Sequence, residues 1–228
     1  LRAGIRAIVD ATAAQAHSDP SEARRLFEGA QRYLDWAAAA LAAVSPRLIA
    51  VGGLSGSGKS KLARGLAPGL GNGCGARVVR TDAIRKRLAG VPLTARLGAH
   101  GYSREMTERT YLGLYDEASA ALAAGCTVIA DAVFAAPGER AAIRALAARH
   151  GVPFTGLWLE APTAVLAGRV DGRRGDVSDA GLAVVRMQAG YDIGEIDWAR
   201  IDSSGSAEAT LAAARGRLET VEAAAAAP

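Results

Sequence analysis

One stretch of eight residues constrains this chain more than any other. Residues 53–60 read Gly-Leu-Ser-Gly-Ser-Gly-Lys-Ser and fit the pattern G-x-x-x-x-G-K-[ST] at every fixed position. An apolar run, residues 48–51, precedes this stretch, and a helix-capable segment follows it from Lys59 onward. A strand, a glycine-rich turn and a helix in this order predict a phosphate-binding loop rather than an ordinary turn.

The residue types within this loop have separate expected roles. The glycines let the backbone curl so that successive N–H groups point at a β-phosphate, and the helix adds the positive end of its dipole. We expect Lys59 to reach the β- and γ-phosphates and Ser60 to supply a hydroxyl to Mg²⁺. The expected cofactor-binding residues of the loop are Gly53, Ser55, Gly56, Ser57, Gly58, Lys59, Ser60 and Lys61.

Strand and helix patterns alternate along the rest of the chain. Apolar runs predict strands at residues 47–52, 76–80, 126–131, 153–160 and 198–202, with helical segments between them. This alternation predicts an α/β fold with a doubly wound, mostly parallel five-stranded sheet. Ligands of such sheets bind at the carboxyl ends of the strands, where Gly53, Asp82 and Asp131 are expected to converge.

The chain divides into three predicted parts. Residues 1–44 show apolar positions at helical spacing and predict a helical linker or appendage, while residues 45–220 carry the alternating pattern. Residues 221–228 are alanine-rich and predict a disordered tail. Because the chain starts with Leu1 rather than Met, we expect it to be a fragment that follows a further domain.

Two aspartates are candidates for chemistry, and each also has a plain structural interpretation. Asp82 could accept a hydroxyl proton during phosphoryl transfer, or could cap the helix that follows it. Asp131 ends an apolar strand, so it could hold Mg²⁺ or contact the substrate hydroxyl, or could only cap a loop. The sequence leaves open which of them is the base and which is the metal partner.

Several arginines are candidates for binding anionic groups. Arg85 lies one helical turn after Asp82 and could bind the substrate or the γ-phosphate, or could be a solvated helix residue. Arg169 and Arg173 flank a polar loop that could close over the nucleotide, where arginine stabilises transition-state charge. Arg173 is the first choice for a catalytic role, and a solvated surface loop is the alternative. The loop at 89–103 is a candidate acceptor-binding segment.

Composition excludes some classes of protein. Two cysteines, Cys74 and Cys126, are too few for a disulfide framework, so we expect a reducing cytoplasm. No apolar run reaches about 18 residues, so we expect no membrane span. The net charge of +4 is mild and aromatic residues make up 5% of the chain, which argues against nucleic acid as the partner.

The motifs together resemble a known family. Gly56-Ser-Gly-Lys-Ser60, Thr81-Asp-Ala-Ile-Arg-Lys86, Val128-Ile-Ala-Asp-Ala132 and the arginines at 169 and 173 are similar to those of the P-loop kinase-like AAA domain. That domain is often fused behind an aminoglycoside-phosphotransferase-like domain in bacterial proteins. The resemblance extends more distantly to polynucleotide kinase, zeta-toxin and chloramphenicol phosphotransferase, and it covers about residues 47–204.

The resemblance implies a function that the motif alone does not. It implies that Lys59 and Ser60 serve ATP and Mg²⁺, that Asp82 stands at the catalytic position and that Arg85 binds substrate. The expected activity is transfer of the γ-phosphoryl group of ATP to a hydroxyl of a small-molecule acceptor. The alternatives are a polynucleotide 5′-kinase and a nucleotide-sensing ATPase module that regulates an upstream fused domain.

Overall fold

The computed structural model describes residues 1–41, 44–71, 73–95, 97–171, 184, 187–188 and 190–226. Within them, five strands form one sheet in the order β2-β3-β1-β4-β5, and every neighbouring pair is parallel. The strands are β1 (Leu48–Gly52), β2 (Arg77–Arg80), β3 (Val128–Asp131), β4 (Phe154–Glu160) and β5 (Ala199–Asp202). This sheet confirms the predicted α/β fold, and its first strand lies in the middle because the chain crosses over on both sides of it.

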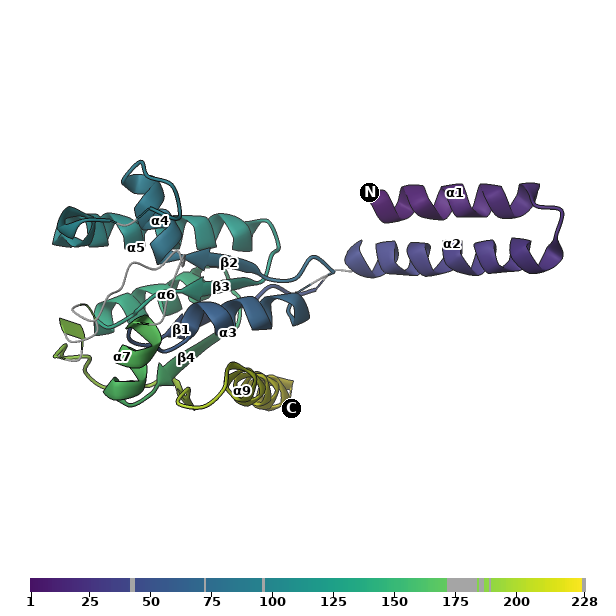
Figure 1. Cartoon of the computed structure of the whole chain (residues 1–228). Coiled ribbons are helices and arrows are strands. Elements are labelled where there is room, and N and C mark those ends of the chain that lie inside the picture. The colour runs from purple at the N-terminus through teal and green to yellow at the C-terminus, as the bar shows by residue number, and fades with distance from the viewer. Residues whose placement is uncertain are drawn as a thin grey trace.

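Helices connect the strands and cover both faces of the sheet (Figure 1). The α-helices of this part are α3 (Lys59–Leu66), α4 (Thr81–Leu88), α5 (Arg104–Ala123), α6 (Pro137–Arg149), α7 (Thr163–Asp171) and α9 (Ala207–Ala226). Short 3-10 turns lie at η1 (Ala67–Gly69) and η2 (Ala99–Tyr102). Two boundaries have clear local causes, because the Ser103 hydroxyl accepts from Met106 N at the start of α5 and a proline opens α6.

The alternation of side chains along each strand builds two cores. Leu48 and Ala50 of β1 face the core beneath α5 and α6, while Ile49 and Val51 face the core beneath α3 and α9. All four residues have no exposed surface. Because β1 is buried on both faces, its continuous apolar run fits a central parallel strand and holds the phosphate-binding loop on a rigid base.

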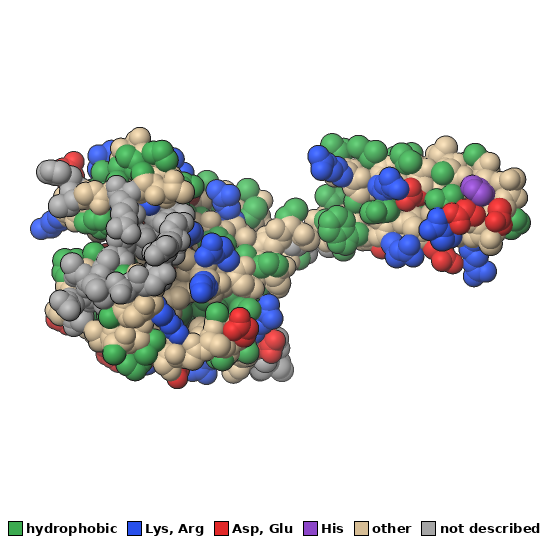
Figure 2. All heavy atoms as spheres, in the orientation of Figure 1, with side chains coloured by type: hydrophobic (Ala, Val, Ile, Leu, Met, Phe, Trp, Pro, Cys, Tyr) green, Lys and Arg blue, Asp and Glu red, His purple; other side chains and the backbone are tan. Residues whose placement is uncertain are grey.

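Helices α1 (Arg2–Ala16) and α2 (Pro20–Leu41) form a hairpin that stands apart from the sheet (Figure 1). Ala7 of α1 and Ala30 of α2 are buried. The apolar residues Leu1, Ile5 and Ile8, by contrast, are exposed on α1, and Figure 2 shows hydrophobic side chains along the outer side of the hairpin. The hairpin therefore keeps an apolar stripe that no described part of the chain covers.

Some boundaries differ from those that the sequence predicts. Helix α9 continues to Ala226, so a helix occupies most of the segment 221–228 that we expected to be disordered. None of the helices in the described ranges is long and apolar enough to cross a bilayer.

Candidate active site

The phosphate-binding loop joins β1 to α3 at the carboxyl edge of the sheet. Gly56 and Gly58 have φ angles of 90° and 93°, which side-chain-bearing residues rarely adopt. A Cβ at Gly56 would lie 2.6 Å from the Leu166 carbonyl oxygen, whereas a Cβ at Gly58 would meet nothing within 4 Å. Gly58 is the N-cap of α3 and offers no capping side chain, so the first N–H groups of the helix are available to an anion.

The other residues of the loop are placed in different ways. Ser55 donates its backbone N–H to Gln188 Oε1 at 2.8 Å, and Lys59 Nζ donates to the Leu54 carbonyl oxygen at 3.0 Å. Ser57 is 1% exposed, and its hydroxyl lies beside Gly53 beneath the loop. Its side chain is therefore turned away from the position of a phosphate, and only its backbone can contribute.

Ser60, Asp131 and Arg80 form a closed network at the end of the loop. Ser60 Oγ donates to Asp131 Oδ2 at 2.6 Å and accepts from Arg80 Nη2 at 2.8 Å. Arg80 Nε also donates to Asp131 Oδ2 at 3.1 Å. Asp131 is 4% exposed, so its carboxylate is balanced by a guanidinium in a nearly dry environment.

The sequence prediction brought Ser60 and Asp131 together but missed Arg80. Arg80 is the last residue of β2 and stands opposite Asp131 in the β2–β3 register. Its position at a strand end, next to a strand that also ends in a charged residue, was the available signal. Asp131 thus has charged and hydroxyl partners beyond the plain loop-capping role that the sequence left open.

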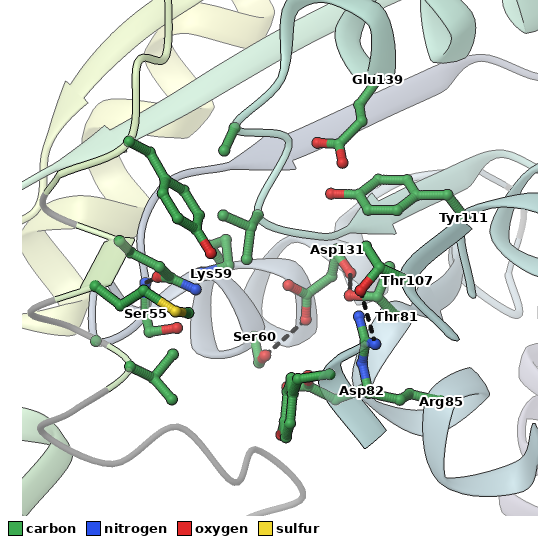
Figure 3. Close-up of a pocket in the computed structure, with 18 of the residues that line it drawn as sticks. Ser55, Lys59, Ser60, Thr81, Asp82, Arg85, Thr107, Tyr111, Asp131 and Glu139 are labelled. Atoms are coloured by element: carbon green, nitrogen blue, oxygen red, sulfur yellow. Dashed lines mark hydrogen bonds between the residues drawn. The ribbon is translucent and has the colours of Figure 1, made fainter. Parts of the chain in front are cut away.

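Asp82 lies in the first turn of α4 and lines the cleft beside the loop (Figure 3). The helix begins at Thr81, with Arg80 as its N-cap, so the interpretation of Asp82 as the N-cap is wrong. Thr81 is held at this edge because its Oγ1 donates to the Asp131 carbonyl oxygen at 3.3 Å. The turn therefore presents Asp82 toward the cleft from a helix that is fixed to the end of β3.

The cleft brings together residues from the loop, α4, α5 and the chain after β3. Figure 3 shows Lys59 and Ser60 on one side and Thr107, Tyr111 and Glu139 on the other. Val184, Met187 and Tyr191 also line it. One hollow therefore holds the phosphate-binding loop, the carboxylates of Asp82 and Asp131, and a second group of polar side chains farther from the loop.

Arg85 lines the cleft but is held by its own neighbours. It is 8% exposed, and its Nη1 donates to the Gly101 carbonyl oxygen at 2.8 Å and to Thr107 Oγ1 at 3.2 Å. Its guanidinium lies 5.0 Å from the centre of the Tyr102 ring. The interpretation of Arg85 as a solvated helix residue is therefore wrong, and the side chain ties the 89–103 loop to α4.

Glu139 and Tyr111 form a polar pair that the sequence prediction missed. The Tyr111 hydroxyl accepts from Phe134 N at 2.9 Å, and the Glu139 carboxylate lies beside it (Figure 3). Burial raises the pKa of Tyr111 well above its ordinary value, so the hydroxyl keeps its proton. Burial also raises the pKa of the Glu139 carboxyl, although the neighbouring Tyr111 hydroxyl and the Ala136 N–H act against the shift.

The loop after β3 that carries these contacts is anchored by Arg140. This guanidinium is 4% exposed and donates to the carbonyl oxygens of Phe134, Ala135, Ile193 and Glu195 at 2.6–3.0 Å. Phe134 has a φ of 51°, the one positive value among the described residues other than glycine. The four hydrogen bonds hold this backbone in an otherwise costly conformation.

A second hollow lies on the other side of the phosphate-binding loop. It is lined by loop residues, Lys61, Arg64, Gly168, Arg169 and Ala207. Arg169 donates to the carbonyl oxygens of Ser203, Ser204 and Gly205, so it clamps the segment between β5 and α9. Arg173, the first choice for a catalytic arginine, lies outside the described residues.

The donor set at Ser60 and Asp131 fits Mg²⁺ rather than a metal held by protein alone. Mg²⁺ takes one or two protein oxygens and completes its octahedron with phosphate oxygens and water. In the described ranges, no group of three or more His, Cys, Asp or Glu could hold a metal ion. One hydroxyl and one carboxylate beside a phosphate cradle meet the requirement of Mg²⁺ bound with a nucleotide.

Comparison with known proteins gives a match to a protein family and matches to individual relatives. Residues 48–191 match the AAA domain family. An uncharacterized protein of Mycobacterium tuberculosis, Rv2004c, is 34% identical over 192 residues, which cover 80% of this chain and 36% of that protein. An adenylyl-sulfate kinase of Myxococcus xanthus is 32% identical over 117 residues, which cover 51% of this chain and 59% of that enzyme. The chain spans little more than a third of the length of the first of these curated relatives.

Solved structures of kinases share the fold. A sugar kinase from Janibacter sp. HTCC2649 has 25% identity and a TM-score of 0.54, with 76% of this chain and 95% of that chain covered. The adenylyl-sulfate (APS) kinase CysC of Mycobacterium tuberculosis, solved with AMPPNP and APS, has 22% identity and a TM-score of 0.57. That match covers 77% of this chain and 98% of CysC. These likenesses extend over the whole sheet and its helices, not only the phosphate-binding loop.

Proposed function

Because this chain belongs to the AAA domain family and has the P-loop fold of kinases, we propose that it transfers the γ-phosphoryl group of ATP to a hydroxyl of a small-molecule acceptor. One observation carries the proposal: Lys59, Ser60, Asp82 and Asp131 all line a single cleft. Phosphoryl transfer requires a phosphate cradle, a metal site and a group that orients the nucleophile, and these residues supply all three.

The phosphate half of the cleft would bind the nucleotide. The N–H groups around Gly56 and Gly58 would hold the β-phosphate, and Lys59 would exchange its contact with the Leu54 carbonyl for phosphate oxygens. Ser60 and Asp131 would hold Mg²⁺, whose charge offsets that of the β- and γ-phosphates when it is bound. The nucleoside would lie in the second hollow, beside Lys61 and Arg169.

The two aspartates then take different roles. Asp131 is buried and already hydrogen-bonded to Ser60, which suits a partner of the metal. Asp82 projects from the start of α4 into the same cleft, which suits a base that accepts the proton of the acceptor hydroxyl. Arg85 lines the acceptor side, where it would contact the substrate directly or position Thr107.

The α1–α2 hairpin supports a further proposal about the complete protein. We propose that the exposed stripe with Leu1, Ile5 and Ile8 packs against an additional domain of a longer chain, of the phosphotransferase-like kind found with this family. Relatives that extend well beyond the matched region are consistent with this arrangement. Free cysteines at Cys74 and Cys126 support a reducing, cytoplasmic location.

A screen of ATP turnover against acceptors tests the proposed function. The purified chain with Mg²⁺ and ATP should release ADP faster when a matching compound from a library of small hydroxyl compounds is added, and the compound should gain a phosphate detectable by mass spectrometry. A 5′-hydroxyl oligonucleotide in the same screen tests the polynucleotide kinase. ADP release without any phosphorylated product would instead favour the nucleotide-sensing module.

A further inference from the structure

Glu139 lies in the acceptor half of the cleft, at a place that none of the sequence motifs marks. We propose that Glu139 binds the acceptor, and that the acceptor is a polyhydroxylated compound that presents hydroxyl or amine donors to it and carries no anionic group there. The proposal rests on the kinase function above and deepens it. It names a sugar, a polyol or an amino derivative of either as the class of substrate.

The carboxylate of Glu139 has acceptor capacity that the protein uses only in part. Ala136 N donates to Glu139 Oε2 at 3.2 Å. An ionised carboxylate has about four lone-pair positions, so this donor leaves room for others. Glu139 lines the same cleft as Asp82, so a bound acceptor can meet both carboxylates (Figure 3).

The carboxylate is also held in place before any ligand binds. Ala136 N holds one oxygen of the carboxylate, and Phe134 N fixes the hydroxyl of Tyr111, which lies beside Glu139 (Figure 3). Arg140 fixes the carbonyl oxygens of Phe134 and Ala135, and the Phe134 ring lies 5.8 Å from that of Tyr111. Side chains fixed in this way bind without the entropy cost of ordering themselves, which is how specific sites are built.

Charge decides which acceptors fit this position. A phosphate, sulfate or carboxylate next to Glu139 would place two anions together in a partly dry cleft, which costs free energy. Arg140 and Arg85 are the cations that act on Glu139; the Arg140 guanidinium donates to four carbonyl oxygens, and Arg85 Nη1 donates to Gly101 and Thr107. Val133, Met187 and Tyr191 add apolar walls that suit a carbon skeleton between its hydroxyl groups.

Glu139 also has a structural role, which the test must separate from binding. It is the third residue of α6 and reaches back to the N–H of Ala136, so it helps to cap the helix. Glu139→Gln keeps a carbonyl oxygen for this cap and removes only the charge. Glu105→Gln, at an exposed position in the first turn of α5, is the matched control.

Binding rather than turnover is the direct measurement. Calorimetry with the AMPPNP–Mg²⁺ complex present would compare monosaccharides, polyols, their amino derivatives and their phosphorylated derivatives as probes. We expect a neutral or amino probe to bind wild type more tightly than its phosphorylated counterpart. Glu139→Gln should weaken the neutral or amino probe by roughly 10- to 100-fold, because a hydrogen bond to a charged group is lost, and should not weaken the phosphorylated one.

The outcomes separate the two proposals. Failure of AMPPNP to bind would overturn the kinase function itself. If AMPPNP binds but anionic probes are preferred, or Glu139→Gln behaves like Glu105→Gln toward every probe, the kinase proposal survives and the assignment of Glu139 is overturned. If no neutral or amino probe binds, the assignment of Glu139 is also overturned. A thermal melt of each variant shows whether an observed loss comes from unfolding.

Discussion

Arg80 and Asp131 end two neighbouring parallel strands, stand opposite each other in register and join their side chains in an ion pair of 3.1 Å. The same guanidinium donates to Ser60, so a cation already links the two side chains that are proposed to serve Mg²⁺. Arg80 therefore stabilises the metal side of the cleft through Asp131 and through Ser60 at once. Removal of the Arg80 side chain should therefore lower the free energy of unfolding and also change the dependence of nucleotide binding on Mg²⁺.

Arg80→Met tests this link. The change should lower the free energy of unfolding by about 3–5 kcal/mol, because it leaves a buried carboxylate without its cation. Urea denaturation gives the value, and Mg²⁺ with AMPPNP should recover part of it by supplying a new cation. Arg87→Met is the control, since Arg87 pairs with Glu117 at the exposed surface and such pairs contribute less than about 1 kcal/mol. Equal losses in the two variants would contradict the prediction.

Lys59→Ala tests the phosphate cradle. The ammonium group of Lys59 is proposed to contact the β- and γ-phosphates, so its loss should weaken AMPPNP binding by roughly 10- to 100-fold and abolish turnover. Fluorescence of a labelled nucleotide measures the affinity. Arg104→Ala, which removes an exposed cation on α5, should bind AMPPNP as wild type does. Unchanged turnover by Lys59→Ala would overturn the assignment of the loop.

Asp82→Asn and Asp131→Asn separate the base from the metal partner. Asp82→Asn should reduce phosphoryl transfer by about 10²–10⁴-fold while nucleotide affinity in Mg²⁺ stays unchanged, because only proton acceptance is lost. Asp131→Asn should instead raise the Mg²⁺ concentration required for tight nucleotide binding. Titration of Mg²⁺ against AMPPNP affinity distinguishes the two variants. If Asp82→Asn alone changes the Mg²⁺ requirement, the roles are exchanged.

The raised pKa of Glu139 predicts a pH dependence of stability. Burial makes the folded protein hold the Glu139 proton more tightly than the unfolded chain, in which the group titrates near 4.5. Its contribution to the free energy of unfolding therefore falls as pH rises from there through the folded pKa. Urea unfolding of wild type and Glu139→Gln across this range should show the difference, wild type minus variant, decreasing with pH. A difference that increases would show that the pKa is lowered instead.

The part of the site that follows from the sequence is the part built on local patterns. The loop is recognised from its motif. The approach of Asp82 and Asp131 to one edge of the sheet follows from the topology of parallel strands, which the alternation of strand and helix patterns in the sequence predicts. Ser103 as a helix cap and Pro137 as a helix start are equally local. The five strands were predicted with errors of at most two residues, all at their first residues.

The residues that the sequence did not reveal act over long separations. Gln188 accepts a hydrogen bond from the backbone of Ser55, although 133 positions separate them in the sequence, and no sequence pattern predicts such a contact. Lys86, the residue after Arg85 in α4, is 1% exposed, and its Nζ donates to the Leu93 carbonyl oxygen. Glu139 is an acid in the first turn of α6, which is common in helices. Only the folding of the loop after β3 turns its carboxylate toward the cleft.

The phosphate-binding loop is a wall shared by two hollows, since Gly56, Gly58 and Ser60 line both. Ligands on the two sides would touch the same few peptide groups, so their binding free energies are linked. Linkage is reciprocal: whatever factor a nucleotide imposes on acceptor affinity, the acceptor imposes on nucleotide affinity. A substitution in this wall would therefore alter the two equilibria together, and selection for a new acceptor has to proceed within that thermodynamic constraint.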